Sequence, residues 1–213
     1  MTLREWQKLF KKPSELIVQA SVKDGTDAWQ PFPIGMCYGY MYVDHSSPAL
    51  QLGSHTKTVF CGIGAQTDRH RRGSLPINRA KIVQTLAAHS IKNTQLMVPI
   101  YFQALPHYKF VISPEGNGID CHRHYEALLA GCIPIMEHNP LIEEKYAGLP
   151  ILYTTDYSEI TEGYLNKRYE EMIDATYDFS RLFIANYTDE QQLQIRDCGN
   201  YWTERLGRRK FYS

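Results

Sequence analysis

The sequence predicts an α/β protein built around a parallel sheet with helices on its faces. From about Lys57 onward, short apolar segments alternate with segments whose apolar residues follow helical spacing. Strands that alternate with helices form parallel sheets, and short continuous apolar runs are typical of strands buried on both faces. The 213 residues, 43% of them hydrophobic, are enough to bury such a core without disulfide bonds.

The first part of the chain, residues 1–56, holds too few expected elements for a large domain of its own. We expect it to form a small N-terminal subdomain, and residues 57–213 to form the main domain. Pro31 and Pro33 interrupt the first part. Its expected elements are a helix over residues 2–12 and strands over residues 15–21 and 36–43.

The expected elements of the main domain follow from apolar periodicity and from residues that begin or end helices. Pro76 stands in the first turn of one helix, and Gly131 follows the end of another. Thr188 and Gln191 have the spacing of a capping box. The first expected strand begins at Lys57, and three more span residues 109–113, 132–136 and 149–153. The expected helices span residues 76–90, 99–105, 121–130, 141–147, 161–177 and 188–206. Residues 68–73 are expected to form a loop.

A glycine-rich loop follows the second expected strand of the main domain, with the sequence PEGNGID over residues 114–120. In such folds ligands bind at the carboxyl ends of the strands. Gly116 and Gly118 let the backbone approach a ligand and adopt positive φ, and Asp120 is suited to cap the next helix. Arg123 in the first helical turn opposes the helix dipole, so it predicts a bound anion there.

Two further sets of charged residues have alternative explanations. Glu126 lies one turn after Arg123, so it forms either an ion pair on a solvated helix face or a carboxylate that accepts from ribose hydroxyls. The basic loop after the first strand either meets the same anion or is a solvated charge run. The basic residues of this set are Arg69, Arg71, Arg72 and Arg79.

Composition excludes several functions. The formal net charge is zero, with 23 basic and 23 acidic residues, which disfavours nucleic-acid binding. Five widely spaced cysteines indicate free thiols in a reducing compartment. The N-terminus lacks the apolar region of a signal peptide, and no run is long enough to span a membrane. We therefore expect a cytoplasmic protein, which could also be one part of a longer multidomain chain.

A nicotinamide-dependent enzyme is disfavoured by the loop after the first parallel strand. Its sequence, GIGAQTD over residues 62–68, has no third glycine at the spacing of the dinucleotide-binding motif.

The segment SPEGNGIDCHRHYEALLAGCIPIM, residues 113–136, resembles the donor-binding segment of exostosin-like glycosyltransferases, notably those of algae and large algal viruses. The resemblance rests on Glu115-Gly116-x-Gly118, Arg123, Glu126-Ala127, Gly131 and Pro134. LPILYTTDYSEIT, residues 149–161, is similar to a second element of that family, and the likeness extends over residues 58–206. It implies the nucleotide-binding half of a GT-B fold. It also implies inverting transfer of a sugar from a UDP- or GDP-sugar to a hydroxyl of a glycan or glycoprotein, with no metal or other cofactor.

The resemblance also implies roles for individual residues. Glu126 would hold the donor ribose, and Arg123 with Arg72 or Arg79 would neutralise the diphosphate. The donor sugar or diphosphate would lie against Gly116, Asn117 and Gly118.

The N-terminal side is the point of departure from the family, because about 56 residues make a reduced acceptor subdomain. The catalytic base of an inverting transfer must reach the acceptor hydroxyl. Asp44 is the first candidate and Asp27 the second, although an Asp in the setting of Asp44 also forms turns. The alternative function is a nucleotide- or phospho-ligand-binding module without catalysis, which turnover of the donor would distinguish.

Overall fold

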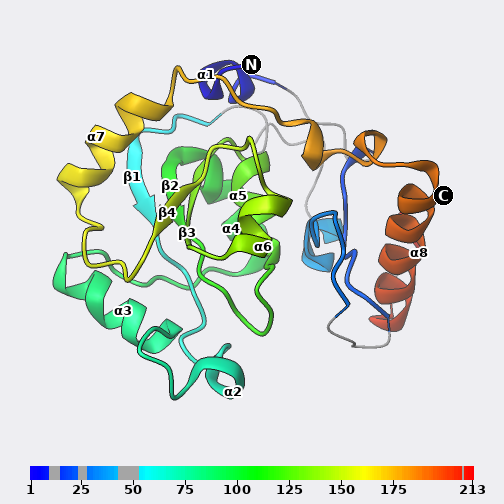
Figure 1. Ribbon diagram of the computed structural model, residues 1–213, viewed down its shortest axis with the longest axis horizontal. Helices are drawn as coiled ribbons and strands as arrows, with labels where there is room; N and C mark the ends of the chain where they lie inside the picture. The colour runs from blue at the N-terminus through cyan, green and yellow to red at the C-terminus, as the bar shows by residue number, and fades with distance from the viewer. Residues whose placement is uncertain (10–14, 24–27, 43–52, 208) are drawn as a thin grey trace.

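The computed structural model of the chain describes residues 1–9, 15–23, 28–42, 53–207 and 209–213 (Figure 1). It contains a four-stranded parallel sheet with helices around it, so the expected α/β class with a Rossmann-like parallel sheet is confirmed. The strands are β1 (Lys57–Phe60), β2 (Tyr108–Ile112), β3 (Ile133–Glu137) and β4 (Leu152–Thr154).

The strand order in the sheet is β1-β2-β3-β4, the same as the order in the chain. Among the described strands the order therefore does not reverse, so this part of the sheet has no topological switch point of the kind at which ligands often bind. The register pairs Phe110 of β2 with Val59 of β1 and with Ile133 of β3. All five residues of β3 are buried, as its continuous apolar run predicts.

Most helices around the sheet begin and end close to their expected positions, but α3 begins at Arg79 after its N-cap Asn78, so Pro76 precedes the helix, and α7 ends at Met172 instead of at residue 177. The α-helices are α1 (Leu3–Trp6), α2 (Arg69–Arg72), α3 (Arg79–Ala88), α4 (Val98–Ala104), α5 (His122–Leu129), α6 (Pro140–Lys145), α7 (Glu162–Met172) and α8 (Asp189–Arg205), and the 3-10 helices are η2 (Tyr38–Tyr42), η4 (Leu105–His107), η5 (Ser180–Leu182) and η6 (Ile184–Asn186). Helix α5 packs against β3, and α7 packs against β1.

Local capping explains the helix boundaries. The capping box of Thr188 and Gln191 begins α8, as predicted. Gly131 follows α5 and Gly148 follows α6, with φ of +76° and +84°. This left-handed backbone conformation is one that glycine tolerates, and it ends the helical path of the chain.

The two strands expected before residue 56 do not form. Leu16 and Val18 make only isolated bridges, and η2 occupies most of the second expected strand. Three backbone hydrogen bonds do join the two segments, from Gln19 N to Met36 O, from Ala20 N to Ile34 O and from Met36 N to Ile17 O. The donors that follow bond to side chains instead, because Cys37 N–H donates to Glu126 and Tyr38 N–H donates to Gln19. A row of donors used in this way cannot build a strand ladder.

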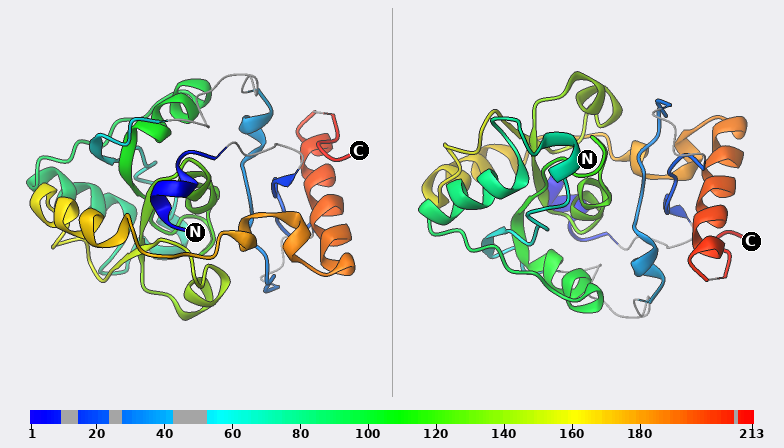
Figure 2. Two further views of the ribbon diagram at one scale, coloured as in Figure 1. Left: turned by 90° about the horizontal axis from the view of Figure 1, so that it is seen from above. Right: turned by 90° about the horizontal axis from the view of Figure 1, so that it is seen from below.

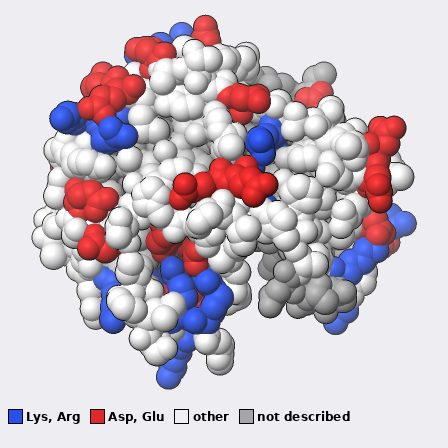
Figure 3. All heavy atoms as spheres, viewed as in Figure 1, with Lys and Arg blue, Asp and Glu red and all other residues white. Residues whose placement is uncertain are grey.

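Two other elements differ in extent. The helix expected over residues 2–12 is described only as α1, and positions 10–12 lie outside the described residues. The expected loop over residues 68–73 contains the single turn of α2. Figure 3 shows Lys and Arg side chains gathered over this part of the surface.

The described residues between 15 and 42 pack beside the C-terminal helix α8, away from the sheet (Figures 1 and 2), whereas α1 packs against the end of α5, where Trp6 Nε1 donates to Leu128 O. The hydroxyl of Tyr212 accepts from Val18 N at 2.8 Å and donates to Leu16 O at 2.8 Å, and Trp202 Nε1 donates to Ser21 O at 2.9 Å. We call the described residues between 15 and 42 and between 183 and 213 the side lobe. Segments from the first and last parts of the chain therefore build this lobe together.

Candidate functional site

A pocket of about 600 Å³ opens between the sheet and the side lobe. Its walls include the glycine-rich loop after β2, the loop after β1, the first turns of α5, the start of α4, and Ile34 and Cys37 of the side lobe. Six of the seven residues expected to bind a donor line it: Arg79, Gly116, Asn117, Gly118, Arg123 and Glu126. Its volume lies within the range of small-molecule sites, about 300–1,000 Å³.

The glycine-rich loop approaches its neighbours closely. Gly116 N donates to Gly118 O at 2.9 Å, and a Cβ at Gly116 would lie 2.9 Å from Arg79 Nη2. Neither glycine has the positive φ that we expected. Gly116 is needed for close approach, whereas a Cβ at Gly118 would meet its nearest neighbour at 3.7 Å.

His124 holds the two ends of this loop together. Its Nε2 donates to Ile119 O at 3.2 Å, so in the neutral ring Nδ1 accepts from the Ser113 hydroxyl at 2.7 Å. Burial lowers the pKa of His124 to about 4, so the ring is neutral at neutral pH. The sequence analysis did not predict a role for this residue. It could have been found as a histidine on the buried face of the helix that follows the loop.

Asp120 is not the N-cap of α5, contrary to expectation. Cys121 holds that position without a side-chain capping bond. The Asp120 carboxylate instead accepts from Lys145 Nζ at 2.9 Å, from Tyr146 OH at 2.8 Å and from Ile34 N at 3.0 Å. These three donors turn it away from the helix, and it thereby fastens residue 34 of the side lobe to the pocket wall.

Glu126 is buried in the pocket wall, 4% exposed, and this excludes the solvated helix face considered above. Its Oε2 accepts from Tyr101 OH at 2.8 Å, and its Oε1 accepts from Cys37 N at 3.2 Å. Each carboxylate oxygen has two lone pairs, so both oxygens retain capacity for a ligand hydroxyl.

Arg123 lies beside Glu126, and only some of its N–H groups form hydrogen bonds within the described part of the chain. Its Nη2 donates to Gly62 O at 2.7 Å, while its Nε is buried and has no hydrogen-bond partner in the described part of the chain. Burial acts against the charge, but Tyr101 and Glu126 raise the pKa of Arg123 overall. A half-buried, charged guanidinium whose buried Nε is not satisfied is suited to an oxyanion ligand.

Arg79 lies beneath the loop. Its Nε donates to Glu115 O at 2.7 Å and its Nη2 donates to Pro114 O at 2.9 Å. Burial lowers its pKa. Arg79 therefore supports the loop backbone and adds positive charge to the pocket, with fewer donors left for a ligand than Arg123.

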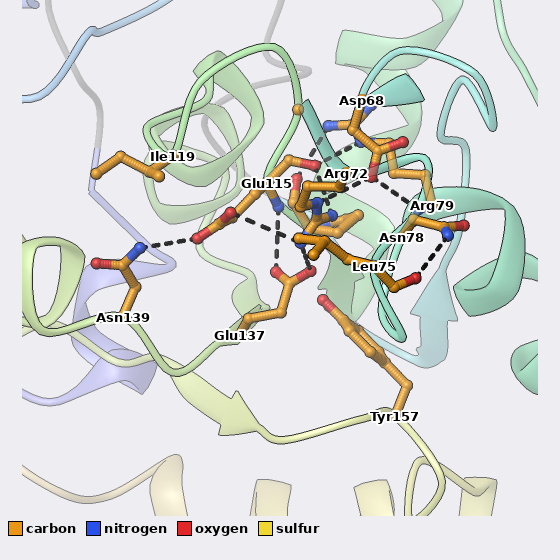
Figure 4. A network of polar contacts seen from close by, with 12 residues as sticks. Asp68, Arg72, Leu75, Asn78, Arg79, Glu115, Ile119, Glu137, Asn139 and Tyr157 are labelled. Carbon is orange, nitrogen blue, oxygen red and sulfur yellow. Dashed lines mark hydrogen bonds and ion pairs between the residues drawn. The ribbon is translucent and has the colours of Figure 1, made fainter. Parts of the chain in front are cut away.

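Arg72, the seventh expected residue, lies outside this pocket in a buried ion network (Figure 4). Its Nε donates to Asp68 at 2.9 Å, its Nη1 donates to Glu137 at 2.8 Å and its Nη2 donates to Glu115 O at 3.1 Å. Arg72 thus holds the loop from behind. The sequence analysis did not predict the carboxylates of this network. They could have been found in the sequence as acidic residues that stand at or after the ends of several expected strands.

The cysteines of the pocket are not activated nucleophiles. Cys37 and Cys121 line it, and all five cysteines of the chain are free thiols. Burial raises the pKa of Cys37, and it raises the pKa of Cys121 to about 11. The thiolate form needed for attack is therefore scarce at neutral pH.

Asp44 and Asp27, the candidate bases, lie outside the described residues. Within the described ranges, no group of three or more His, Cys, Asp or Glu side chains has an arrangement that could hold a metal ion. No helix in the described part of the chain has the length and apolar character needed to cross a membrane.

Comparison with known proteins gives no family assignment: no family model matches this chain, and no curated protein matches it. The fold and the pocket define the chain as an α/β protein with a pocket, lined by Arg79, Arg123 and Glu126 among others, at the carboxyl edge of a parallel sheet.

Proposed function

We propose that this chain is an inverting, metal-independent glycosyltransferase that moves a sugar from a UDP- or GDP-sugar to a hydroxyl of a glycan or glycoprotein. One observation carries the proposal. Residues of the glycine-rich motif line a single pocket in which the half-buried Arg123 adjoins the buried carboxylate of Glu126, and the buried Nε of Arg123 has no hydrogen-bond partner among the described residues.

In this proposal the sheet with α5 is the nucleotide-binding half of a GT-B-like fold, and the part of residues 1–56 that lies in the side lobe belongs to a reduced acceptor-side subdomain. Glu126 accepts from the ribose hydroxyls with the lone pairs that Tyr101 and Cys37 leave open. Arg123 donates from Nε to the diphosphate, and Arg79 adds positive charge. The donor sugar lies against Gly116–Gly118.

The reaction is a displacement at the anomeric carbon of the donor sugar. The acceptor oxygen forms a bond to that carbon while the bond from the carbon to the diphosphate oxygen breaks, and the electron pair leaves with the diphosphate. Arg123 stabilises the charge that develops there, in place of a metal ion. The acceptor proton passes to a base, for which Asp44 is the first candidate.

A panel of nucleotides tests donor binding. UDP, GDP, CMP and NAD⁺ are added to the protein with EDTA or with Mn²⁺, and the melting temperature is recorded, because a ligand that binds the folded state raises it. We expect UDP or GDP to raise the melting temperature equally with EDTA and with Mn²⁺. A shift that requires Mn²⁺ would contradict the metal-independent mechanism, and no shift with either nucleotide would contradict donor binding.

Turnover separates the transferase from the alternative, a non-catalytic binding module. Release of UDP or GDP from nucleotide sugars is followed with and without a mixture of glycan acceptors. Acceptor-dependent release supports the transferase. Binding of the nucleotide without any release would leave the binding module as the function.

A further inference from the structure

A second cavity of about 360 Å³ opens at the carboxyl ends of β3 and β4. We call it the β3–β4 cavity. Glu137 at the end of β3 and Thr154 at the end of β4 line it. It shares no lining residue with the first pocket, but the two adjoin at one peptide, because Glu115 lines the second and Gly116 lines the first. Its volume also falls in the range of small-molecule sites, about 300–1,000 Å³.

The charges that line the β3–β4 cavity compensate one another. Arg71 and Arg72 lie among them with Glu115 and Glu137. Arg71 is 2.7 Å from Glu115, and Arg72 is 2.8 Å from Glu137. An anionic ligand would have to compete with these carboxylates for the guanidinium groups, and a cation would have to compete with the arginines. The lining therefore favours a ligand without net charge.

The carboxylates still have hydrogen-bonding capacity. Glu137 accepts one bond at each oxygen, from Arg72 and from Glu115 N, and Glu115 accepts from Asn139 at 2.9 Å and from Arg71. Each oxygen can accept a second bond. Because these oxygens are held in place by charged and backbone donors, they are oriented in advance for ligand hydroxyls.

The other wall of the cavity is apolar. Leu75, Pro76 and Ile77 line it, and the His138 ring at its edge stacks on Tyr153 with ring centroids 5.3 Å apart. A lining with hydroxyl-directed acceptors on one side and apolar groups on the other fits a ring that carries hydroxyls at its rim and C–H groups on its face.

A buried donor lies behind the same carboxylate. The hydroxyl of Tyr157 is fully buried and is directed toward Glu137 (Figure 4), and burial together with the nearby Glu137 carboxylate raises the pKa of Tyr157. Tyr157 does not line the cavity, so it supports Glu137 from behind.

We propose that the β3–β4 cavity binds one neutral saccharide unit, which hydrogen-bonds to Glu115 and Glu137 and packs on Leu75, Pro76 and Ile77. This binding is independent of the nucleotide. Only the role of the bound saccharide, as part of the acceptor, rests on the proposed function.

The test is ligand-observed NMR with free monosaccharides, namely glucose, galactose, mannose, xylose and fucose, each at millimolar concentration, with inorganic phosphate as the anionic comparator. The blocking variant is Thr155→Trp, which places a large ring in the lining. The matched control is Ser158→Trp, which is exposed on the following turn and does not line the cavity. Every protein is also titrated with UDP and GDP.

We expect at least one neutral monosaccharide to bind to the wild type and to the control, and to bind about 10-fold more weakly to Thr155→Trp. Saturation with UDP or GDP leaves this binding in place. The proposal is overturned if no neutral monosaccharide binds, if Thr155→Trp binds as well as the control, or if phosphate displaces the sugar. Monosaccharide binding without nucleotide binding would instead contradict the proposed function and leave the saccharide site standing.

Discussion

Replacing Arg72 with Met tests whether the buried ion network holds the glycine-rich loop. The Arg72 side chain is 5% exposed and bonds to Asp68, which is 2% exposed, and to Glu137, which is 9% exposed. Methionine fills similar space but leaves these carboxylates buried without their partner. Removing one member of a buried ion pair costs about 3–5 kcal/mol, a large part of the 5–15 kcal/mol that is typical of folded domains.

The assay is urea unfolding followed by circular dichroism and by tryptophan fluorescence, because coincident transitions justify a two-state free energy. The matched control is Arg4→Met. Arg4 forms an ion pair with Asp174 at a similar distance, 2.8 Å, but both side chains are more than half exposed. Solvent screens such a pair, so we expect a much smaller loss of stability. If Arg72→Met and Arg4→Met lose similar free energies of unfolding, the reasoning about the buried network is refuted.

Three further predictions concern single positions. Gly116→Ala places a Cβ 2.9 Å from Arg79 Nη2; we expect weaker UDP or GDP binding by calorimetry with little change in melting temperature, because the end of a long side chain can move. The pKa of His124 falls from 6.5 to about 4 on folding. Its contribution of about 3 kcal/mol to the free energy of unfolding is therefore present above pH 6.5 and is lost as the pH falls toward 4. Urea unfolding at several pH values should show a smaller loss of stability in acid for His124→Gln than for the wild type, and an equal dependence of stability on pH in the two proteins would contradict this. Gly199→Ala places a Cβ 2.6 Å from Val18 O, and we expect it to destabilise the side lobe by about 1–3 kcal/mol in the same urea assay.

The parts of the fold that depend on local patterns could be predicted from the sequence. The buried run of β3 and the capping box at Thr188 involve residues within a few positions of one another, and both were expected correctly. The described segments between residues 15 and 42 could not be predicted, because some of their backbone donors bond to distant side chains. Cys37 N–H, for example, donates to Glu126, which lies 89 positions away.

The candidate site was predicted in part for the same reason. Arg123, Glu126 and the glycines share one strand–loop–helix unit, so their convergence follows from local structure. Arg72 was expected to face a ligand but is bound by Glu137, which lies 65 positions further on. Which of several arginines faces a pocket depends on such long-range partners, and a single sequence does not reveal them.

The most direct test of the proposed function is isothermal titration of UDP and GDP in the presence of EDTA. It compares the wild type with Glu126→Gln and with a control, Glu162→Gln, whose carboxylate lies outside the pocket on α7. We expect one nucleotide to bind to the wild type and the control with similar affinity, and to bind about 10-fold more weakly to Glu126→Gln, a loss of about 1.4 kcal/mol. Equal affinity for all three proteins, or no binding to the wild type, would contradict a nucleotide-sugar site in this pocket.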